Sequence, residues 1–532
     1  MQKTVFLLLI GLSTLGYSQE EQHYINYFDT AHTQKMSEGS MLDGKEHGLW
    51  QYWYPSGKLS EETEYRRGFI NGKQILYFEN GTKELENYYK RGLRDSVYLA
   101  WYENGNSKEK GYFDKDACDS TWLFWKEDGK IWKKEECRNG TRFILDFFDV
   151  DGSKIVDNGS GTLKYYFDNE QLKESSVIDN GMRNGQSIRY FENGDLRYQG
   201  NFKDGIPDGN WKYWYVDSVA WKELTFVNGE LEGPYILYFK NEQISRKGQY
   251  LNGKRNGEWA AFFENGDKDW VGEYVEGKEH GHWKVYFRNG NIESEGEYAL
   301  GEKNGVWTYY FESGKKFRSG NYKDNKEDGE WNSWWENGQV FTHGNYENGL
   351  EESEWISYFE TGRKKDFGSF LHGKMDGLWM GWFEKSNERP VSRTDEGDTK
   401  YRGEWDNGVR TGEWTFWYPK FVKREHGSFK NNLKEGKWEY YTQYGKLESG
   451  GSYKDGSKTG KWFFNYPQGQ IKREQSYKKD RPSGACTVYN ERGFVVNKSN
   501  YTNGRLDGKY QVFDEKGNLK KTSMFKDGKR IK

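Results

Sequence analysis

Aromatic, glycine and polar residues recur along this chain with a period of 24 residues. One complete unit runs from Gly257 to Gly277. It contains a glycine, a tryptophan two residues later, an aromatic pair, an Asn-Gly pair and a Gly-x-Tyr segment. The same order returns 24 residues later, from Gly281. Periods of about 20–50 residues are typical of solenoids and arrays. We therefore expect an array of one small unit.

Each unit predicts a β-hairpin. Side chains alternate between the faces of a strand, so Trp259, Ala261 and Phe263 share one face and Phe262 points to the other. Asn265-Gly266 is expected to form a tight turn in which both residues have positive φ. No stretch keeps a helical period without a glycine interruption. The pattern predicts an all-β fold, an elongated array of about 20 antiparallel β-hairpin repeats of 24 residues in a single-layer, twisted meander.

The phase of the repeat sets the expected boundaries. Residues 19–47 are predicted to form an N-terminal half-repeat that caps the array, and residues 48–532 to form the array itself. The phase slips near 142–160, where we expect a degenerate copy. A polar insertion at 384–400 lengthens one unit and is typical of a surface loop.

The composition alone would suggest disorder, since 31% of the residues are charged and only 34% are hydrophobic. The regular phase of the 65 glycines and 24 tryptophans argues against that interpretation. Stacked hairpins would align the large rings, and each ring buries about 150–250 Å². Glycine in the returning strand would leave room for a neighbouring ring.

Residues 1–18 have the pattern of a signal peptide, with a basic start, an apolar stretch and small residues before Gln19. We therefore expect the chain to be exported and to be periplasmic, exposed at the cell surface or secreted. A formal net charge of −3 gives no support for nucleic-acid binding.

The unit resembles the MORN (membrane occupation and recognition nexus) repeat. The matching elements are Gly-x-Trp, the aromatic pair, the Asn-Gly turn and Gly-x-Tyr-x-x-Gly, over about residues 39–528. The spacing and the Glu-Asn-Gly turns are similar to the bacterial variant found in antitoxin-like proteins. The last two units depart from it at Cys486, Asn490 and Asp514. The resemblance implies a hairpin-array scaffold of a family associated with protein assembly and, in some members, with membrane lipids. It implies no enzymatic activity.

Candidate chemistry is sparse. His280 and His282 lie at one inter-hairpin connection without the ligand set of a zinc site. The turn glutamates recur at one position in many units, which favours solvation over catalysis. We expect no enzymatic activity, catalytic residue, cofactor or metal site. Cys118 and Cys137 fall in one repeat and could pair in an oxidising compartment or remain as two thiols.

One set of residues is a candidate binding surface. A tryptophan or tyrosine recurs five residues after the opening glycine, on the face opposite to the first tryptophans. Aligned rings of this kind can anchor a protein partner or stack on sugar rings, or they can simply cover the sheet. We call this set the second aromatic column: Trp53, Trp101, Trp125, Trp214, Trp334, Trp382 and Trp417, together with Tyr77, Tyr190 and Tyr238.

The sequence thus predicts an exported, non-enzymatic repeat scaffold for protein–protein or cell-envelope interaction. The expected partner is a protein, with a glycan or a lipid surface as the alternative. A glycan-binding module that uses the second aromatic column is one alternative function. An antitoxin- or immunity-like protein that neutralises a toxin by binding is the other.

Overall fold

The computed structural model describes residues 21–384 and 399–532. These residues contain 44 β-strands and no helix, and hence no helix long and apolar enough to cross a membrane. The predicted all-β fold is confirmed. The signal peptide predicted at residues 1–18 and most of the insertion at 384–400 lie outside the described residues.

The described chain divides into two compact units, residues 21–243 with 250–253 and residues 244–249 with 254–532. Strand β20 (Ile244–Leu251) contributes residues to both. The first unit contains β1 (Glu21–Tyr27), β2 (Lys35–Leu42), β3 (Lys45–Trp53), β4 (Leu59–Arg66), β5 (Phe69–Tyr77), β6 (Lys83–Lys90), β7 (Leu93–Trp101), β8 (Ser107–Asp114), β9 (Ala117–Trp125), β10 (Ile131–Arg138), β11 (Thr141–Phe148), β12 (Lys154–Asp157), β13 (Ser160–Tyr166), β14 (Leu172–Asp179), β15 (Met182–Tyr190), β16 (Leu196–Lys203), β17 (Ile206–Trp214), β18 (Ala220–Val227) and β19 (Glu230–Tyr238).

The second unit contains β21 (Lys254–Phe262), β22 (Lys268–Val275), β23 (Lys278–Tyr286), β24 (Ile292–Ala299), β25 (Glu302–Tyr310), β26 (Lys316–Lys323), β27 (Lys326–Trp334), β28 (Val340–Glu347), β29 (Leu350–Tyr358), β30 (Lys364–Leu371), β31 (Lys374–Trp382), β32 (Thr399–Asp406), β33 (Val409–Tyr418), β34 (Val422–Lys430), β35 (Leu433–Tyr441), β36 (Leu447–Lys454), β37 (Ser457–Asn465), β38 (Ile471–Lys478), β39 (Arg481–Tyr489), β40 (Val495–Thr502), β41 (Arg505–Leu506), β42 (Gly508–Phe513), β43 (Leu519–Lys526) and β44 (Lys529–Arg530).

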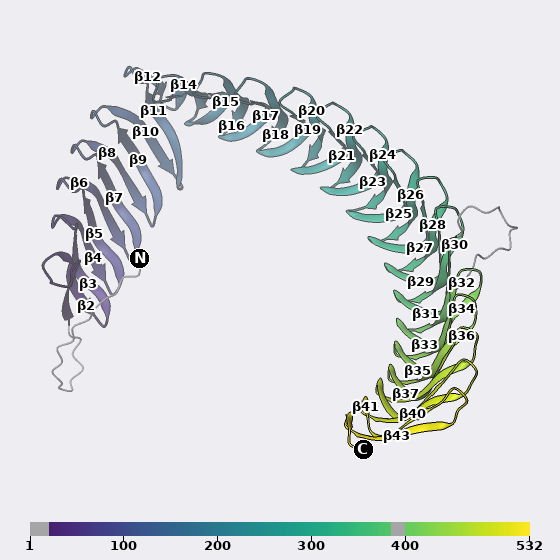
Figure 1. Cartoon of the computed structure of the whole chain (residues 1–532). Coiled ribbons are helices and arrows are strands. Elements are labelled where there is room, and N and C mark those ends of the chain that lie inside the picture. Colours follow the sequence, from purple (N-terminus) through teal and green to yellow (C-terminus); the bar gives the residue numbers. More distant parts are fainter. Residues whose placement is uncertain (1–20, 385–398) are drawn as a thin grey trace. The chain divides into compact units, whose positions relative to one another are not determined.

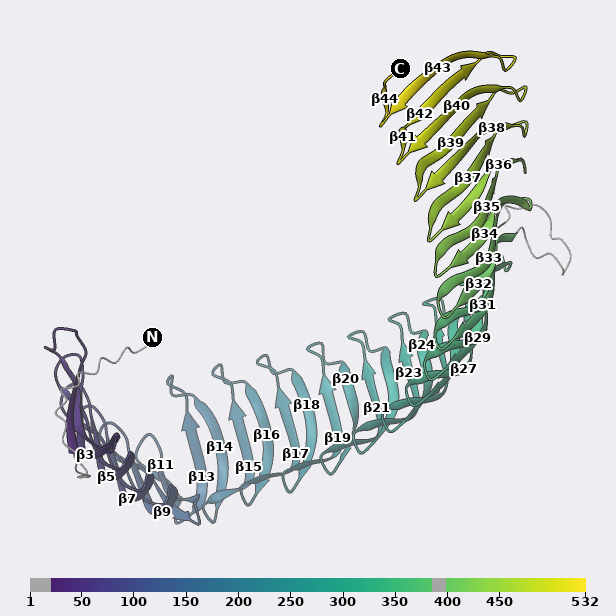
Figure 2. The same cartoon turned by 90° about the horizontal axis from the view of Figure 1, so that it is seen from below.

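Within each unit the strands form an antiparallel meander in chain order. Strand β23, for example, pairs with β22 before it and with β24 after it. Figures 1 and 2 show the strands of each unit side by side in this order. The degenerate copy predicted near 142–160 forms the four-residue strand β12 between β11 and β13. Its core contains the aliphatic residues Val156, Leu163 and Ile178 together with Phe147.

The Asn-Gly turns differ from the prediction. Gly266 has φ +89°, whereas Asn265 does not have positive φ. The N–H of Gly266 donates to the carbonyl of Phe263, and the N–H of Phe263 to the carbonyl of Asp267. Phe263 therefore belongs to the turn rather than to the strand, and the loop is a type I turn that ends in a left-handed glycine. Two-residue turns with both φ positive lie at the opposite ends of the strands, as at Asn348 (53°) and Gly349 (84°).

Asparagine suits the first kind of turn because its side chain bonds in two directions. Asn289 Oδ1 accepts from the N–H of Asn291 in the same turn, at 2.9 Å. Asn289 Nδ2 donates to the carbonyl of Glu312 in the next repeat, at 2.7 Å. The turns therefore also join neighbouring hairpins.

The core consists of tryptophan rings that lie on glycines of the preceding hairpin. A Cβ atom added to Gly272 would lie 2.2 Å from the ring of Trp283. The indole Nε1 of Trp283 donates to the carbonyl of Glu273, 3.2 Å away. The same pairing recurs throughout, as Gly39–Trp50, Gly111–Trp122, Gly200–Trp211, Gly248–Trp259, Gly272–Trp283, Gly296–Trp307, Gly320–Trp331, Gly344–Trp355, Gly368–Trp379, Gly403–Trp414, Gly427–Trp438 and Gly451–Trp462.

Repeats that lack the tryptophan also lack the glycine. In one repeat Ser176 stands in the place of the glycine and Ser187 in the place of the tryptophan, and their hydroxyl groups lie 2.8 Å apart. In another repeat Gln475 replaces the glycine and lies opposite Cys486, which replaces the tryptophan. Cys486 is buried, as expected of a small core substitute. The two positions thus form one packing unit.

Exchanging both members of one pair tests this packing unit. We expect Gly272→Ser to destabilise strands β22 and β23 by about 1–3 kcal/mol, because the new side chain collides with Trp283. Trp283→Ser should cost about 3–5 kcal/mol through lost burial. The double variant should cost less than the sum, because the serines can pair as Ser176 and Ser187 do. Hydrogen exchange of β22 and β23 measures these local stabilities.

The matched control uses a glycine outside the pair. Gly329 has φ +77°, and nothing lies within 4 Å of an added Cβ there. Gly329→Ser and Trp283→Ser should therefore have additive costs. If the stability costs of Gly272→Ser and Trp283→Ser were also additive, the two residues would not form one packing unit.

A second prediction concerns the residue that opens each unit. This residue has positive φ, as at Gly281 (66°), and Ser353 occupies the place with φ 62°. A residue other than glycine pays a steric cost in this region. We expect Ser353→Gly to stabilise β29 by about 0.5–1 kcal/mol, after the larger chain entropy of glycine is subtracted. Ser357→Gly in the same strand should destabilise it. A lower thermal unfolding temperature for Ser353→Gly than for Ser357→Gly would refute the argument.

Candidate functional site

The second aromatic column occupies an equivalent place in each hairpin. Trp53, Trp101, Trp125, Trp214, Trp334 and Trp382 each end the long strand of their hairpin, and Trp417 is the penultimate residue of β33. Six of the seven are half-buried, whereas Trp382 is only 3% exposed. The structure therefore places all seven alike within their units, and it leaves six of them partly open to solvent.

Charged side chains lie beside this column. Lys35 Nζ is 4.8 Å from the ring centroid of Trp53, and Lys83 Nζ is 5.7 Å from that of Trp101. Lys83 also pairs with Glu86, with 2.6 Å between Nζ and Oε2. The exposed parts of the column therefore alternate with charged groups.

Tyrosines at the same place donate to a glutamate of the preceding strand. The hydroxyl of Tyr77 donates to Glu62, at 2.8 Å, and that of Tyr310 to Glu295, at 2.6 Å. Burial, together with the Glu295 carboxylate, raises the pKa of Tyr310 to about 12. The hydrogen bond from Tyr310 in turn lowers the pKa of Glu295. These pairs hold the rings in place and are structural.

The first tryptophan column, on the opposite face, is closed by cations. Lys303 Nζ lies 4.1 Å from the ring centroid of Trp307, and Lys434 Nζ lies 3.8 Å from that of Trp438. Burial lowers the pKa of Lys303. Trp307 and Trp438 are 2% and 0% exposed. This face therefore offers little aromatic surface where the repeat is regular.

A hollow of about 410 Å³ interrupts the closed face of the second unit, and a smaller one of about 290 Å³ is lined in part by Trp331, Tyr346 and Trp355. The lining of the larger hollow is aromatic apart from one thioether, one guanidinium and one amide. The residues are Met375, Trp379, Tyr401, Trp405, Arg410, Trp414, Phe416 and Asn432. Sequence reasoning missed this site. The available signal was the loss of the usual residue types at Met375, Gly381 and Trp405, on either side of the predicted insertion.

The histidine and carboxylate candidates form no centre. His282 is exposed, and its Nδ1 lies 3.0 Å from Glu297 Oε1. Within residues 21–384 and 399–532, no group of three or more His, Cys, Asp or Glu side chains could hold a metal ion. The turn glutamates are exposed at Glu79, Glu103, Glu192, Glu264, Glu312, Glu336 and Glu360.

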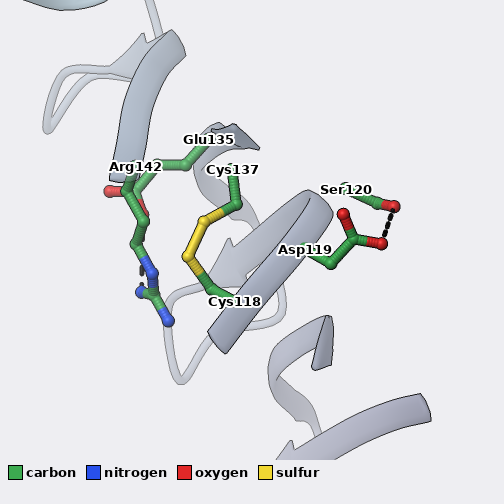
Figure 3. The surroundings of a disulfide bond; sticks show 6 residues. All are labelled: Cys118, Asp119, Ser120, Glu135, Cys137 and Arg142. Carbon is green, nitrogen blue, oxygen red and sulfur yellow. Dashed lines mark hydrogen bonds and ion pairs between the residues drawn. A yellow bond between two sulfur atoms is a disulfide. The ribbon is translucent and has the colours of Figure 1, made fainter. Parts of the chain in front are cut away.

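Cys118 and Cys137 form a disulfide between β9 and β10, with their Cα atoms 5.9 Å apart (Figure 3). Cys137 packs in a cluster with Phe113, Trp122 and Phe124. In a regular repeat the equivalent places hold a cation and a tyrosine, as with Lys303 over the ring of Tyr322, 5.3 Å from its centroid. The disulfide thus replaces that contact above the core tryptophan.

Removing the disulfide should weaken this part of the first unit. Its closed loop spans 19 residues, so we expect reduction or Cys118→Ser to lower local stability by about 3 kcal/mol. Hydrogen exchange of β9 and β10 measures the loss. Reductant should have no effect on the Cys118→Ser variant, and an equal effect there would show that the loss has another cause.

Comparisons with known proteins bear on the repeat rather than on the hollow. No curated protein matches the chain. Among solved structures, that of TcdB2-TccC3-Cdc42 is 8% identical with a TM-score of 0.13, and the match covers 91% of this chain and 32% of that chain. The structure of the Photorhabdus luminescens Tc holotoxin pore is 8% identical with a TM-score of 0.12, and the match covers 94% of this chain and 28% of that chain. This chain therefore spans about a third of their length, and such low similarity constrains neither fold nor function.

A model of the MORN repeat variant matches the chain at residues 46–67, 183–204, 279–299, 303–324, 327–348, 458–479 and 506–527. The matched segments lie in hairpins with the turns and strand pairing described above. The chain is therefore a MORN-repeat protein, with the variant form of the repeat at these seven positions.

Proposed function

We propose that this MORN-repeat chain is an exported, non-enzymatic scaffold that binds a protein partner through the second aromatic column. The observation that supports this proposal is the equivalent placement of six half-buried tryptophans, each at or next to the end of the long strand of its hairpin, with tyrosines such as Tyr77, Tyr190 and Tyr238 at the same place in other hairpins. Each hairpin advances the array by two strand spacings, roughly 9–10 Å. A partner therefore meets rings at regular intervals.

The surroundings of the column favour a protein surface as its partner. Tryptophan and tyrosine dominate binding energy at protein interfaces, where polar groups surround them. Here Lys83 and Glu86 lie beside Trp101, and Glu62 fixes Tyr77. The rings are thus held before binding, which reduces the entropy lost when a partner orders them.

The absence of enzymatic activity is part of this proposal. The polar groups that recur in each unit have structural partners, such as the asparagine that joins two turns and the glutamate that holds a tyrosine. A catalytic centre needs one group whose environment differs from those of its counterparts. The turn glutamates instead share one exposed position.

Two features support export. The sequence of residues 1–18 resembles a signal peptide. The Cys118–Cys137 disulfide is a bond that persists in oxidising compartments and is rare in the cytosol. We therefore propose that the partner is met in the periplasm, at the cell surface or outside the cell.

Glycan binding by the same column is the second candidate. The partly exposed rings favour it, since aromatic faces can stack on sugar rings. Trp382 weighs against a continuous sugar platform, because it is 3% exposed.

A capture experiment with column variants tests the proposal. The full chain is immobilised and incubated with an envelope extract from the source organism, and the same chain is applied to a glycan array. We expect one defined protein to bind with 1:1 saturation, and Trp101→Ala with Trp125→Ala to weaken it at least tenfold. Each truncated hot-spot ring typically costs about 2 kcal/mol or more of binding energy.

Tyr444→Ala supplies the matched control. Tyr444 is 80% exposed but lies in a turn outside the column, so its removal should leave capture unchanged. Sugar binding that disappears with Trp101→Ala would favour the glycan candidate instead. Hydrolase activity lost on changing a single carboxylate would refute the non-enzymatic assignment.

A further inference from the structure

The aromatic core of the second unit has a gap between Trp379 and Trp405. From Trp259 to Trp379 the core tryptophans alternate with tyrosine or phenylalanine rings in a ladder, and successive rings have their centroids 5.0–6.3 Å apart. A second ladder begins with Trp405 against Trp414, at 5.6 Å. Among the residues that the structure describes, no ring contact joins Trp379 to Trp405. The 410 Å³ hollow lies at this gap.

Three departures from the repeat make the hollow. Met375 stands at a place where some repeats have a cation over the core tryptophan, such as Lys303 or Lys434, and others have a glutamate, such as Glu351. Gly381 stands where Tyr309 and Phe416 are found in other repeats, and so leaves that place without a side chain. Trp405 takes the place of the usual tyrosine.

Three of the rings around the hollow, Tyr401, Trp414 and Phe416, are nearly parallel, whereas Trp405 meets Trp414 edge-on. A Cβ added to Gly381 would lie 2.2 Å from the ring of Tyr401, and one added to Gly403 would lie 2.0 Å from Trp414. The planes of Tyr401 and Trp414 differ by 21°, and those of Trp414 and Phe416 by 23°. Trp414 is itself only 3% exposed, so the half-buried rings of Tyr401 and Phe416 supply the surface that another flat ring can meet.

Arg410 brings a positive charge to this platform. Its guanidinium lies 4.3 Å from the ring centroid of Phe429, and its Nε donates to Asn432 Oδ1 at 3.4 Å. Within residues 21–384 and 399–532, the two Nη groups of Arg410 and the Nδ2 group of Asn432 make no hydrogen bond. They are therefore available to a ligand.

In the first unit, the arginine at the place of Arg410 has a carboxylate partner. Arg94 and Asp116 occupy the equivalent positions, with 2.9 Å between Nε and Oδ1, and Arg94 lies 3.9 Å from the ring centroid of Phe113. In the second unit Asn432 replaces that carboxylate. Arg410 thus keeps its place over an aromatic ring but lacks the anion that Arg94 has.

We propose that the hollow receives an aromatic side chain flanked by a carboxylate from the protein partner. This inference rests on the proposed function and adds an anchor site to it, on the face opposite to the second aromatic column. The aromatic ring packs on the half-buried rings of Tyr401 and Phe416, which lie opposite each other on β32 and β33. The carboxylate accepts two hydrogen bonds from Arg410 in the paired geometry that a guanidinium favours. A volume of about 300–1,000 Å³ is typical of ligand pockets.

Two other ligand classes fit less well. A sugar brings many hydroxyl donors, but Asn432 Oδ1 already accepts from the backbone N–H of Arg410, at 2.8 Å, and the hydroxyl of Tyr401 is engaged with Asp366. Hydroxyl groups left without acceptors cost affinity. An organic cation would be attracted by the ring faces but repelled by Arg410.

The test uses N-acetyl-para-fluorophenylalanine as the probe, and its amide as the uncharged analogue. Fluorine NMR follows binding of each to the full chain. We expect the acid to bind at least tenfold more tightly than the amide, since hydrogen bonds to charged groups contribute about 1.5–3 kcal/mol. Arg410→Gln should remove that difference and leave amide binding unchanged.

Asn432→Asp supplies an independent variant, because it restores the ion pair of Arg94 and Asp116. We expect it to abolish the preference for the acid while the chain keeps its thermal stability. Lys434→Gln is the matched control, since Lys434 covers Trp438 at the equivalent place in the next repeat. It should leave probe binding unchanged.

Several outcomes would overturn the anchor site. The first two are equal binding of acid and amide, and no binding of the acid at tens of millimolar. The others are an acid preference that remains in Asn432→Asp, and a loss of that preference in Lys434→Gln as large as in Arg410→Gln. Tighter binding of glucuronic acid than of the probe would replace the peptide ligand with a sugar. Capture of a partner that depends on Trp101 and Trp125 but not on Arg410 would retain the proposed function and reject this inference.

Discussion

The contact of a tryptophan ring with the glycine of the preceding hairpin is the interaction on which this fold depends. It buries a large ring against bare backbone, and its indole N–H satisfies a carbonyl of the neighbouring strand, as Trp283 does with Glu273. Each ring thereby joins two repeats. A chain that is poor in aliphatic residues can therefore form a dry core, because nearest-neighbour contacts recur at every step. The Ser176–Ser187 pair shows that the two positions must change together.

This dependence also explains why the two faces of the sheet differ. Cations such as Lys303 and Lys434 close the face that carries the core tryptophans. The second aromatic column is anchored at strand ends and only half-covered. Repetition therefore gives the second face a regular set of rings. On the closed face, a binding site requires a departure from the repeat, and Gly381, Met375 and Trp405 supply one.

The substitution of Asn432 for an aspartate illustrates how a repeat protein can acquire a specific site. Arg94 and Asp116 form an ion pair. Arg410 retains the same stacking on an aromatic ring, but it lines a hollow and has no carboxylate partner among the described residues. A change of one side-chain group thus converts a structural cation into one that can bind an anion.

The repeat, its period and the all-β hairpin array could be predicted from the residues alone, because the same local pattern occurs in many copies and agrees with the geometry of strands and turns. The sequence also indicated that a glycine accommodates a neighbouring ring. It placed the turn with two positive φ angles at the wrong end of the strand, since Asn265-Gly266 and Asn348-Gly349 are the same dipeptide in different hydrogen-bonding contexts. Only the tertiary structure showed how far the column residues are covered and where Arg410 lies relative to the rings. Those properties depend on which side chains of adjacent hairpins meet, and a linear pattern does not contain that information.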